Sequence, residues 1–320
     1  MPVNNNQPHL WKADVAQSVD MYNKWFMQFA PKAFRDTRVK TTQDVEATLK
    51  STGNMSNIQP AIMRAHPEIL PTLRMSTCPP LAVDRLVGLA DVSKNLVGCM
   101  EEGKLPKLMK PAALDADLKK IANTIMAMVD PDIFVWIGRS TPPTKDETYR
   151  AATIVADRLC GAVANPIIRN AQEARQLAAI GAWLTNRKYK TLPTGSATKF
   201  TDMPAGTFTF RLNVPVSISG TGAQAVNIPI DAVVMPHSAK KGDFPLLIEA
   251  KSAGDFTNTN KRRKEEAMKM NQLRSTYGSK LQFILFLCGY FDGGYLGYEA
   301  QEGIDWVWEH RIDDLAQFGL

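Results

Sequence analysis

The chain has 320 residues, 44% of them hydrophobic and 22% charged, so it is long enough to bury a sizeable core and lacks the composition of a disordered protein. A net charge of +6 favours an anionic partner, although 38 basic against 32 acidic residues is a balance that solubility alone explains. No apolar run reaches the roughly 18 residues of a membrane helix, no secretory signal pattern is present, and the four cysteines form no CxxC pair. We therefore expect a cytoplasmic protein with reduced, buried cysteines and no membrane partner.

The first 150 residues are expected to be mainly helical. In residues 11–34, apolar side chains recur at the three- and four-residue spacing of one helix face, and Pro31 is expected to end or kink that helix. Residues 81–103 repeat the pattern and stop at a glycine. The polar stretch 138–148 contains two prolines, which makes it the expected connection between two domains.

The second expected domain, residues 151–320, has a different pattern. Alternating and β-branched residues mark two strands, and continuous apolar runs mark two buried ones. Helical patterns precede and separate these strands, so the region is predicted to have an α/β fold. The predicted strands are 207–218, 225–235, 244–252 and 281–291, and the predicted helices are 147–164, 170–189 and 260–278.

Two carboxylates and a lysine lie in consecutive predicted strands. Glu249 and Lys251 follow the apolar run 244–248, and because side chains alternate along a strand they project to the same side. Asp231 belongs to the preceding strand and meets Glu249 if the two strands are antiparallel neighbours. Two carboxylates and the Ala250 carbonyl suit Mg²⁺, and Lys251 is then placed to orient or help deprotonate an attacking water or to stabilise charge on a phosphate. The pattern indicates phosphodiester hydrolysis. The alternative is a strand-end salt bridge worth under about 1 kcal/mol.

These residues resemble a known motif. The sequence "PID", 17 further residues and "EAK", preceded by a helix with Glu173 and followed by a basic helix and a strand, is similar to the PD-(D/E)xK nuclease superfamily. The resemblance implies that Asp231 and Glu249 are metal ligands, Lys251 is the catalytic lysine, and Glu173 is an accessory acidic residue that contacts a metal through water. The chain departs from the motif in one respect, because it has Pro-Ile-Asp where the superfamily has Pro-Asp.

Longer segments resemble the XamI-type restriction endonucleases, and the likeness covers most of the chain. It implies a mixed sheet flanked by helices in residues 151–320, and a helical region 1–150 that clamps DNA or forms dimer contacts. It further implies a Mg²⁺-dependent type II enzyme that cuts double-stranded DNA at a short site, leaving a 5′-phosphate and a 3′-hydroxyl. Such an enzyme usually works as a homodimer, beside a cognate DNA methyltransferase in the same host. The resembling segments are 22–38, 73–90, 169–190, 248–278 and 283–315.

The start of the predicted helix 260–278 is the expected contact with DNA. Short polar residues at a helix N-terminus expose backbone N–H groups to phosphate oxygens, and four basic residues follow them. The alternative is a solvated charged face, balanced by Glu265 and Glu266. Trp306 and Trp308 have the two-residue spacing of a strand, which favours packing, and stacking on bases is the alternative. The expected DNA-binding residues are Asn258, Asn260, Lys261, Arg262 and Arg263.

Two other functions remain open from the residues alone. A structure-specific repair or junction nuclease on the same core would cleave branched DNA without regard to sequence. A non-catalytic DNA-binding protein on the same fold would bind DNA without cutting it, although such a protein has no need for the Asp231, Glu249 and Lys251 set.

Overall fold

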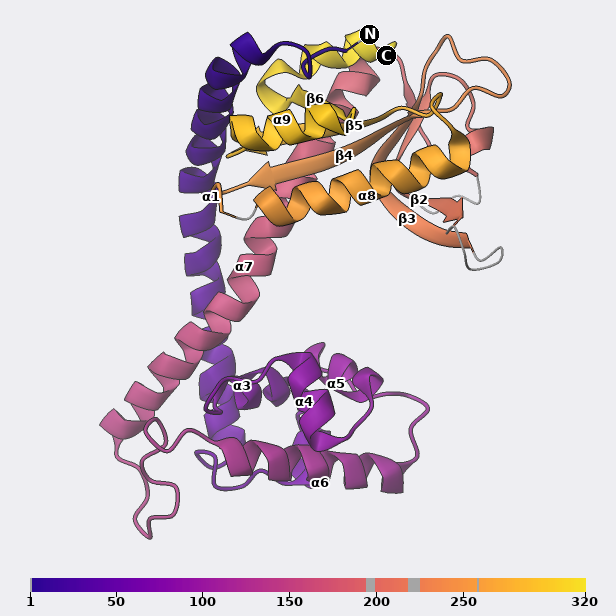
Figure 1. Cartoon of the computed structure of the whole chain (residues 1–320). Helices are drawn as coiled ribbons and strands as arrows, with labels where there is room; N and C mark the ends of the chain where they lie inside the picture. Colours follow the sequence, from indigo (N-terminus) through magenta and orange to yellow (C-terminus); the bar gives the residue numbers. More distant parts are fainter. Residues whose placement is uncertain (1, 194–198, 218–224, 258) are drawn as a thin grey trace. The chain divides into compact units, whose positions relative to one another are not determined.

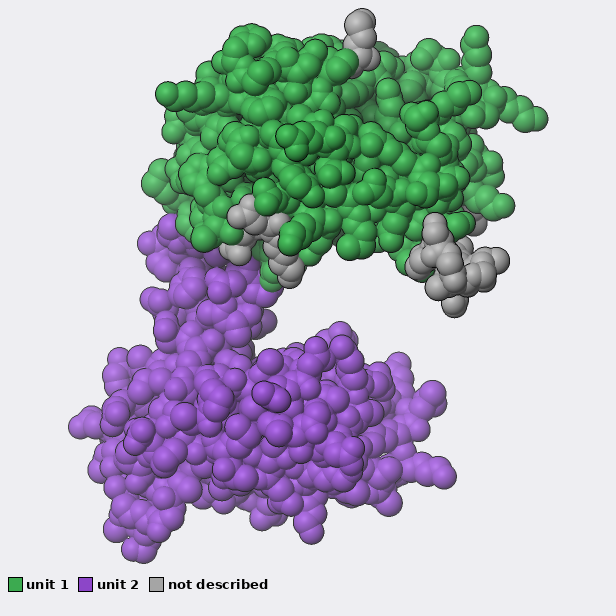
Figure 2. Space-filling view, in the orientation of Figure 1, with its two compact units in different colours: residues 1–29, 169–320 green, residues 30–168 purple. Residues whose placement is uncertain are grey.

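The computed structural model describes residues 2–193, 199–217, 225–257 and 259–320, except the side chains of residues 225 and 260–262. The chain divides into two compact units (Figure 2). Unit 1 contains Met1–Phe29 and Arg169–Leu320, and unit 2 contains Ala30–Ile168. The domain boundary expected near residue 150 falls inside a helix, and both ends of the chain belong to the same unit.

Two long helices each contribute to both units. The first, α1 (Pro8–Ser51), runs through Pro31, so of the two expected effects of this proline, an end or a kink, the helix does not end there. The second, α7 (Lys145–Asn186), is continuous through Pro166 and replaces the two separate helices predicted over this region. By length and composition α7 could also cross a membrane, but a core helix passes the same test, and Cys160 and Ile180 of α7 are buried.

Unit 2 is helical, as predicted for this part of the chain. Its helices enclose one hydrophobic core that includes Leu70, Leu73, Leu118 and Phe134. Arg74 is buried in this unit and donates two hydrogen bonds, of 2.7 and 2.6 Å, to the carboxylate oxygens of Glu101. Besides its parts of α1 and α7, the unit contains α2 (Pro60–Ala65), α3 (Leu70–Met75), α4 (Val83–Ala90), α5 (Lys94–Glu101), α6 (Pro111–Met128) and the 3-10 turn η1 (Pro67–Ile69).

Unit 1 is built on a mixed sheet, which has six strands among the described residues, in the order β1-β2-β3-β4-β5-β6 (Figure 1). The pairs β2–β3 and β3–β4 are antiparallel, while β1–β2, β4–β5 and β5–β6 are parallel. The unit is therefore α/β with a mixed sheet and flanking helices, as expected. The strands are β1 (Lys190–Thr191), β2 (Thr207–Ser217), β3 (Ala225–Met235), β4 (Leu246–Ala253), β5 (Phe283–Gly289) and β6 (Asp305–Trp308).

Helices cover both faces of this sheet. The helices α8 (Thr259–Tyr277) and α9 (Gly293–Gln301) lie against one face (Figure 1), where Met270 and Leu296 join a core with Leu247 and Leu285. The C-terminal part of α7 packs on the other face. Alternate residues of β4 and β5 face the two cores because side chains alternate along a strand. Two short 3-10 segments, η2 (Phe200–Asp202) and η3 (Glu309–Phe318), complete the unit.

The four strands predicted from the sequence are present as β2 to β5, with ends that differ by at most two residues and, for β3, agree. Trp306 and Trp308 lie on β6 and are fully buried, so they pack in the core, as their spacing in a strand favoured, and do not stack on bases. The four cysteines are free thiols; Cys160 and Cys288 are buried as expected, whereas Cys78 is exposed.

Candidate active site

The antiparallel pairing of β3 and β4 brings Asp231 to β4. The registered pairs end at Ala232 and Ile248, so Asp231 and Glu249 are the next residues along the two strands. The Ala250 N–H donates a hydrogen bond of 2.8 Å to Asp231 Oδ2. The structure therefore brings together the two carboxylates that the sequence placed in consecutive strands.

A local break in β2 and β3 sets the direction of Asp231. The pairing between these strands passes from Phe210–Ala232 to Leu212–Ile230 without a partner pair between them. Arg211, at the missing position, has a φ of 54°, which is rare for a residue other than glycine. Even-numbered core residues on the two sides of this break face different cores, because Ile230 belongs to one core and Ala232 to the other. Asp231 thus lies at the point where the alternation of side chains between the two faces of the sheet is interrupted. Such irregularities often redirect a side chain at a functional site.

Glu249 and Lys251 project from β4 toward α8. Glu249 is only 4% exposed, and Lys251 Nζ donates to its Oε1 at 2.9 Å. A second ammonium, Lys269 Nζ on α8, donates to the same oxygen at 2.6 Å. No described residue offers a hydrogen bond to the other carboxylate oxygen, Glu249 Oε2. An unpaired buried carboxylate oxygen is costly in a protein interior, and a bound cation would satisfy it.

The carboxyl of Asp231 lies in an unfavourable environment for a charge. Burial, followed by the negative charge of Glu249, raises its pKa to about 6, against a weaker opposing effect of the hydrogen bond from Ala250. Burial opposes the charged form of Lys251, but Glu249 and Glu266 outweigh it and raise the pKa of the ammonium. The lysine is therefore a cation in this site, suited to orienting a water or stabilising a phosphate rather than to removing a proton.

Glu173, the expected accessory acid, lies on α7 beside this site. It lines a hollow of about 200 Å³ together with Gln176, Ala250 and Lys251. Its negative charge contributes to the raised pKa of Asp231. Glu173 also accepts a hydrogen bond of 2.9 Å from Arg211 and remains partly exposed. Glu173 is thus close to Ala250 and Lys251, and its contact with a metal through water stays a prediction.

The group of Asp231, Glu249 and the Ala250 backbone fits a divalent cation that needs few protein ligands. Among the described residues no three His, Cys, Asp or Glu side chains gather as a complete metal cage. Mg²⁺ does not require one, because it keeps several waters and is held by one or two carboxylates and substrate oxygens. The free Glu249 Oε2 and the raised pKa of Asp231 are the observations that favour such an ion.

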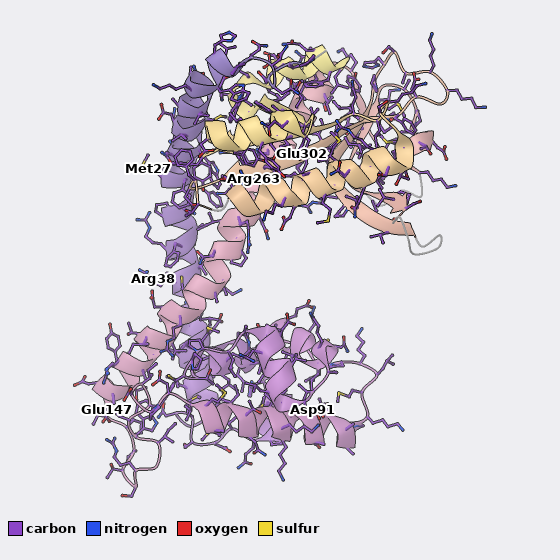
Figure 3. The ribbon with its side chains drawn as sticks, viewed as in Figure 1. Met27, Arg38, Asp91, Glu147, Arg263 and Glu302 are labelled. Carbon is purple, nitrogen blue, oxygen red and sulfur yellow. The ribbon has the colours of Figure 1, made fainter. Side chains whose placement is uncertain are left out.

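The expected DNA contacts lie at the start of α8. Asn258 falls outside the described residues, as do the side chains of Asn260, Lys261 and Arg262, although these three positions belong to the first turn of the helix. Arg263, labelled in Figure 3, is half-buried near the start of α8. Its guanidinium lies 4.7 Å from the centre of the Tyr298 ring. Stacking on Tyr298 leaves Arg263 less free for a phosphate than a solvated arginine would be.

Three polar residues near the site were not predicted. Gln176 of α7 is buried and donates to the carbonyl oxygens of Lys251 and Phe286, at 3.3 and 3.1 Å, which ties the helix to β4 and β5. Glu266 and Lys269 of α8 contact the β4 pair. A solvated charged face that includes Glu266 is one of the two alternatives for this helix, but Glu266 is only 1% exposed. The spacing of an acid and a lysine by one helical turn was the only signal for them.

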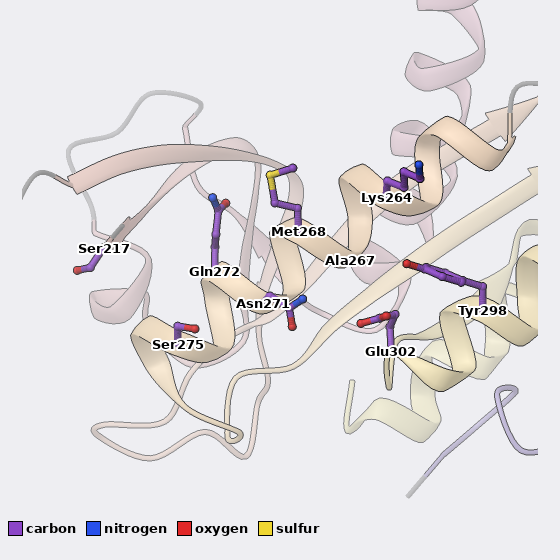
Figure 4. Close-up of a pocket in the computed structure, with 9 residues that line it drawn as sticks. All are labelled: Ser217, Lys264, Ala267, Met268, Asn271, Gln272, Ser275, Tyr298 and Glu302. Carbon is purple, nitrogen blue, oxygen red and sulfur yellow. The ribbon is translucent and has the colours of Figure 1, made fainter. Parts of the chain in front are cut away.

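A larger hollow of about 530 Å³ lies elsewhere on unit 1, between α8, α9 and the end of β2 (Figure 4). Its α8 side chains include Lys264, Met268, Asn271 and Ser275, which recur at helical spacing on a different face from Glu266 and Lys269. Asp231, Glu249 and Lys251 do not line this hollow, so it is separate from the site described above.

Two acids and a charged lysine on adjacent strands of an α/β sheet can hold a divalent cation and offset negative charge on a phosphate ester. The family model of the XamI restriction endonucleases matches residues 53–308. The type II restriction enzyme SalI of Streptomyces albus G is 53% identical over 317 residues, which cover 99% of each chain.

The chain therefore belongs to the XamI restriction endonuclease family and is a type II restriction enzyme. Among solved structures, the crystal structure of protein VC1899 from Vibrio cholerae is 12% identical, with a TM-score of 0.30 over 79% of this chain. The chain spans 55% of that protein, and so remote a likeness adds nothing to the assignment.

Proposed function

We propose that the protein is a PD-(D/E)xK endonuclease that uses Mg²⁺ to hydrolyse phosphodiester bonds at a short specific site in double-stranded DNA, leaving a 5′-phosphate and a 3′-hydroxyl. The observation that carries the proposal is the convergence of Asp231, Glu249 and Lys251 at one place, with Glu249 Oε2 lacking a hydrogen-bond partner in the described part of the chain. Membership of a restriction endonuclease family favours this function over a repair nuclease or a DNA-binding protein without activity.

Each residue has a distinct part in this proposal. Asp231 and Glu249, with the Ala250 carbonyl, would hold the metal, and Glu173 would support it through water. Mg²⁺, when bound, lowers the pKa of water and stabilises negative charge on phosphate oxygens. Lys251 keeps its proton next to Glu249, so it orients the attacking water by hydrogen bonding and offsets charge on the scissile phosphate.

The remaining partners follow from the proposed reaction. A two-fold symmetric duplex site is matched by a homodimer, and the helices of residues 1–150 would clamp DNA or form dimer contacts. The basic start of α8, at positions 258–263, would contact phosphates. A cytoplasmic enzyme of this kind requires a cognate DNA methyltransferase that protects the host's own sites.

The test is digestion of unmethylated phage DNA of known sequence with Mg²⁺ or with EDTA. We expect discrete fragments that require Mg²⁺, are absent with Glu249→Ala, and persist with Asp20→Ala, which removes an exposed carboxylate of the same unit. A smear would instead indicate cleavage without sequence specificity, and retarded but uncut DNA would indicate a binding protein. Full activity of Glu249→Ala would show that the site is elsewhere.

A further inference from the structure

The carboxylate of Glu249 is held by two ammonium groups on one of its oxygens. Lys251 comes from the same strand, and Lys269 reaches it from α8 at the shorter distance, 2.6 Å against 2.9 Å. Both lysine side chains are 23% exposed, while that of Glu249 is 5% exposed. Because both donors lie on Oε1, the carboxylate has a fixed orientation in which Oε2 is left without a donor among the described residues.

A second acid on α8 completes this arrangement. Glu266 lies one helical turn before Lys269, and its Oε1 is 3.8 Å from Lys251 Nζ. Its other oxygen accepts a hydrogen bond of 2.6 Å from the Tyr295 hydroxyl of α9. Two residues of a strand and two of a helix thus form an alternating set of two acids and two lysines, anchored in the core between α8 and α9.

The environment of Glu266 contains a third carboxyl that adds little charge. Glu299 of α9 is fully buried, and burial together with the neighbouring Glu266 raises its pKa to about 9. At neutral pH this group is protonated. The negative charge that faces Lys251 from α8 is therefore that of Glu266, and Tyr295 holds it in place.

We propose that Lys269 and Glu266 are positioning residues of the nuclease site: Lys269 fixes the orientation of Glu249, so that a divalent cation on Oε2 is held in the position that cleavage requires, and Glu266 holds the Lys251 ammonium. This inference rests on the proposed function. It assigns to α8 a part in the site that does not depend on contact with DNA, since neither side chain needs to touch the substrate.

The proposal has a consequence that an ordinary structural support would not have. Lys269 and a divalent cation act on the same carboxylate, and like charges at such distances repel. Removing the ammonium should therefore strengthen cation binding while it slows cleavage, because Glu249 loses its fixed orientation. Loss of a residue that only maintains the fold would weaken binding and cleavage together.

The experiment uses the full-length protein and the variants Lys269→Met, Lys269→Arg and Glu266→Gln. Lys280→Met is the matched control, since it removes an exposed lysine of the same unit. Calorimetric titration with Ca²⁺ in the absence of DNA measures cation binding, and single-turnover digestion with Mg²⁺ measures cleavage. For Lys269→Met we expect Ca²⁺ to bind about tenfold more tightly and cleavage to slow by about ten- to a hundredfold.

The other variants separate the two roles. Lys269→Arg retains the charge, so its affinity for Ca²⁺ should return to the wild-type value and most of the cleavage rate should be restored. Glu266→Gln should slow cleavage with little change in Ca²⁺ binding. Unchanged or weaker Ca²⁺ binding by Lys269→Met, or wild-type cleavage by both Lys269→Met and Glu266→Gln, would overturn the inference. If the wild-type protein neither binds Ca²⁺ nor cuts DNA, it is the proposed function that fails.

Discussion

Replacing Asp231 by asparagine should abolish cleavage and yet stabilise the metal-free protein at neutral pH. The pKa of this carboxyl is about 6 in the folded protein and has its ordinary value of 3.8 in the unfolded chain. Between these values the folded state binds a proton that the unfolded chain does not. The stability contributed by this proton is complete below pH 3.8 and is lost as the pH rises through about 6. Above that range the folded protein bears the full cost of a buried carboxylate.

The size of this cost follows from the shift. Roughly two pKa units at about 1.36 kcal/mol each give about 3 kcal/mol, and partial exposure of Asp231 to solvent reduces this to about 2 kcal/mol. Asparagine has nearly the same shape and its oxygen still accepts from the Ala250 N–H, so Asp231→Asn should recover most of that amount at pH 8. At pH 5, where the wild-type carboxyl is largely protonated, the gain should fall to roughly half.

Urea unfolding in EDTA, followed by tryptophan fluorescence, measures this difference. Five of the six tryptophans lie in unit 1, so the signal reports the unit that contains the site. Asp20→Asn, at an exposed position of α1, should leave the free energy of unfolding unchanged at both pH values. If Asp231→Asn is no more stable than wild type at pH 8, or gains the same amount at pH 5, then Asp231 does not carry a buried negative charge and the argument for a cation at this place loses its basis.

Two further substitutions, each with a matched control, test the packing within each of the two units. Arg74→Met should lower the free energy of unfolding of unit 2 by about 3 kcal/mol, because it leaves Glu101 without the arginine that donates to both its oxygens. Lys94→Ala, which breaks an exposed ion pair, should change this free energy by less than about 0.5 kcal/mol. Circular dichroism during urea unfolding compares the two variants. Gly289→Ala should yield little folded protein in solubility and circular dichroism assays, because φ is 102° and a Cβ would lie 2.1 Å from the carbonyl oxygen at the end of β4. Gly88→Ala, with open space around its Cβ, should fold normally.

The strand-borne part of the site could be predicted because it depends on local patterns. The apolar run before Glu249 marks a buried strand, and the alternation of side chains then determines that Lys251 shares its side. The position of Asp231 required only one further assumption, antiparallel pairing with the preceding strand, and the structure has that pairing. The sequence did not indicate the break at Arg211, because an arginine in a strand gives no sign that its φ will be positive.

The long helices were harder to predict for a different reason. Pro31 and Pro166 each remove a backbone donor, which in an isolated helix favours an end or a kink. In both cases the helix continues on either side of the proline, since packing of its two halves compensates for the lost hydrogen bond. The two prolines also lie within three residues of the divisions between the units, so the sequence marked these places but not the continuity of the helices through them.

The residues of α8 show why a motif search finds only part of such a site. Whether Glu266 and Lys269 face β4 or solvent depends on the rotation of α8 about its own axis, which is set by Met270 and Leu273 in the core. The average polarity of the helix conceals this, because charged residues surround the buried positions on every side. A relative that kept Asp231, Glu249 and Lys251 but had apolar residues at 266 and 269 would match the motif equally well. It would bury Glu249 with one ammonium instead of two, and by the reasoning above it would bind a cation more tightly and use it less well.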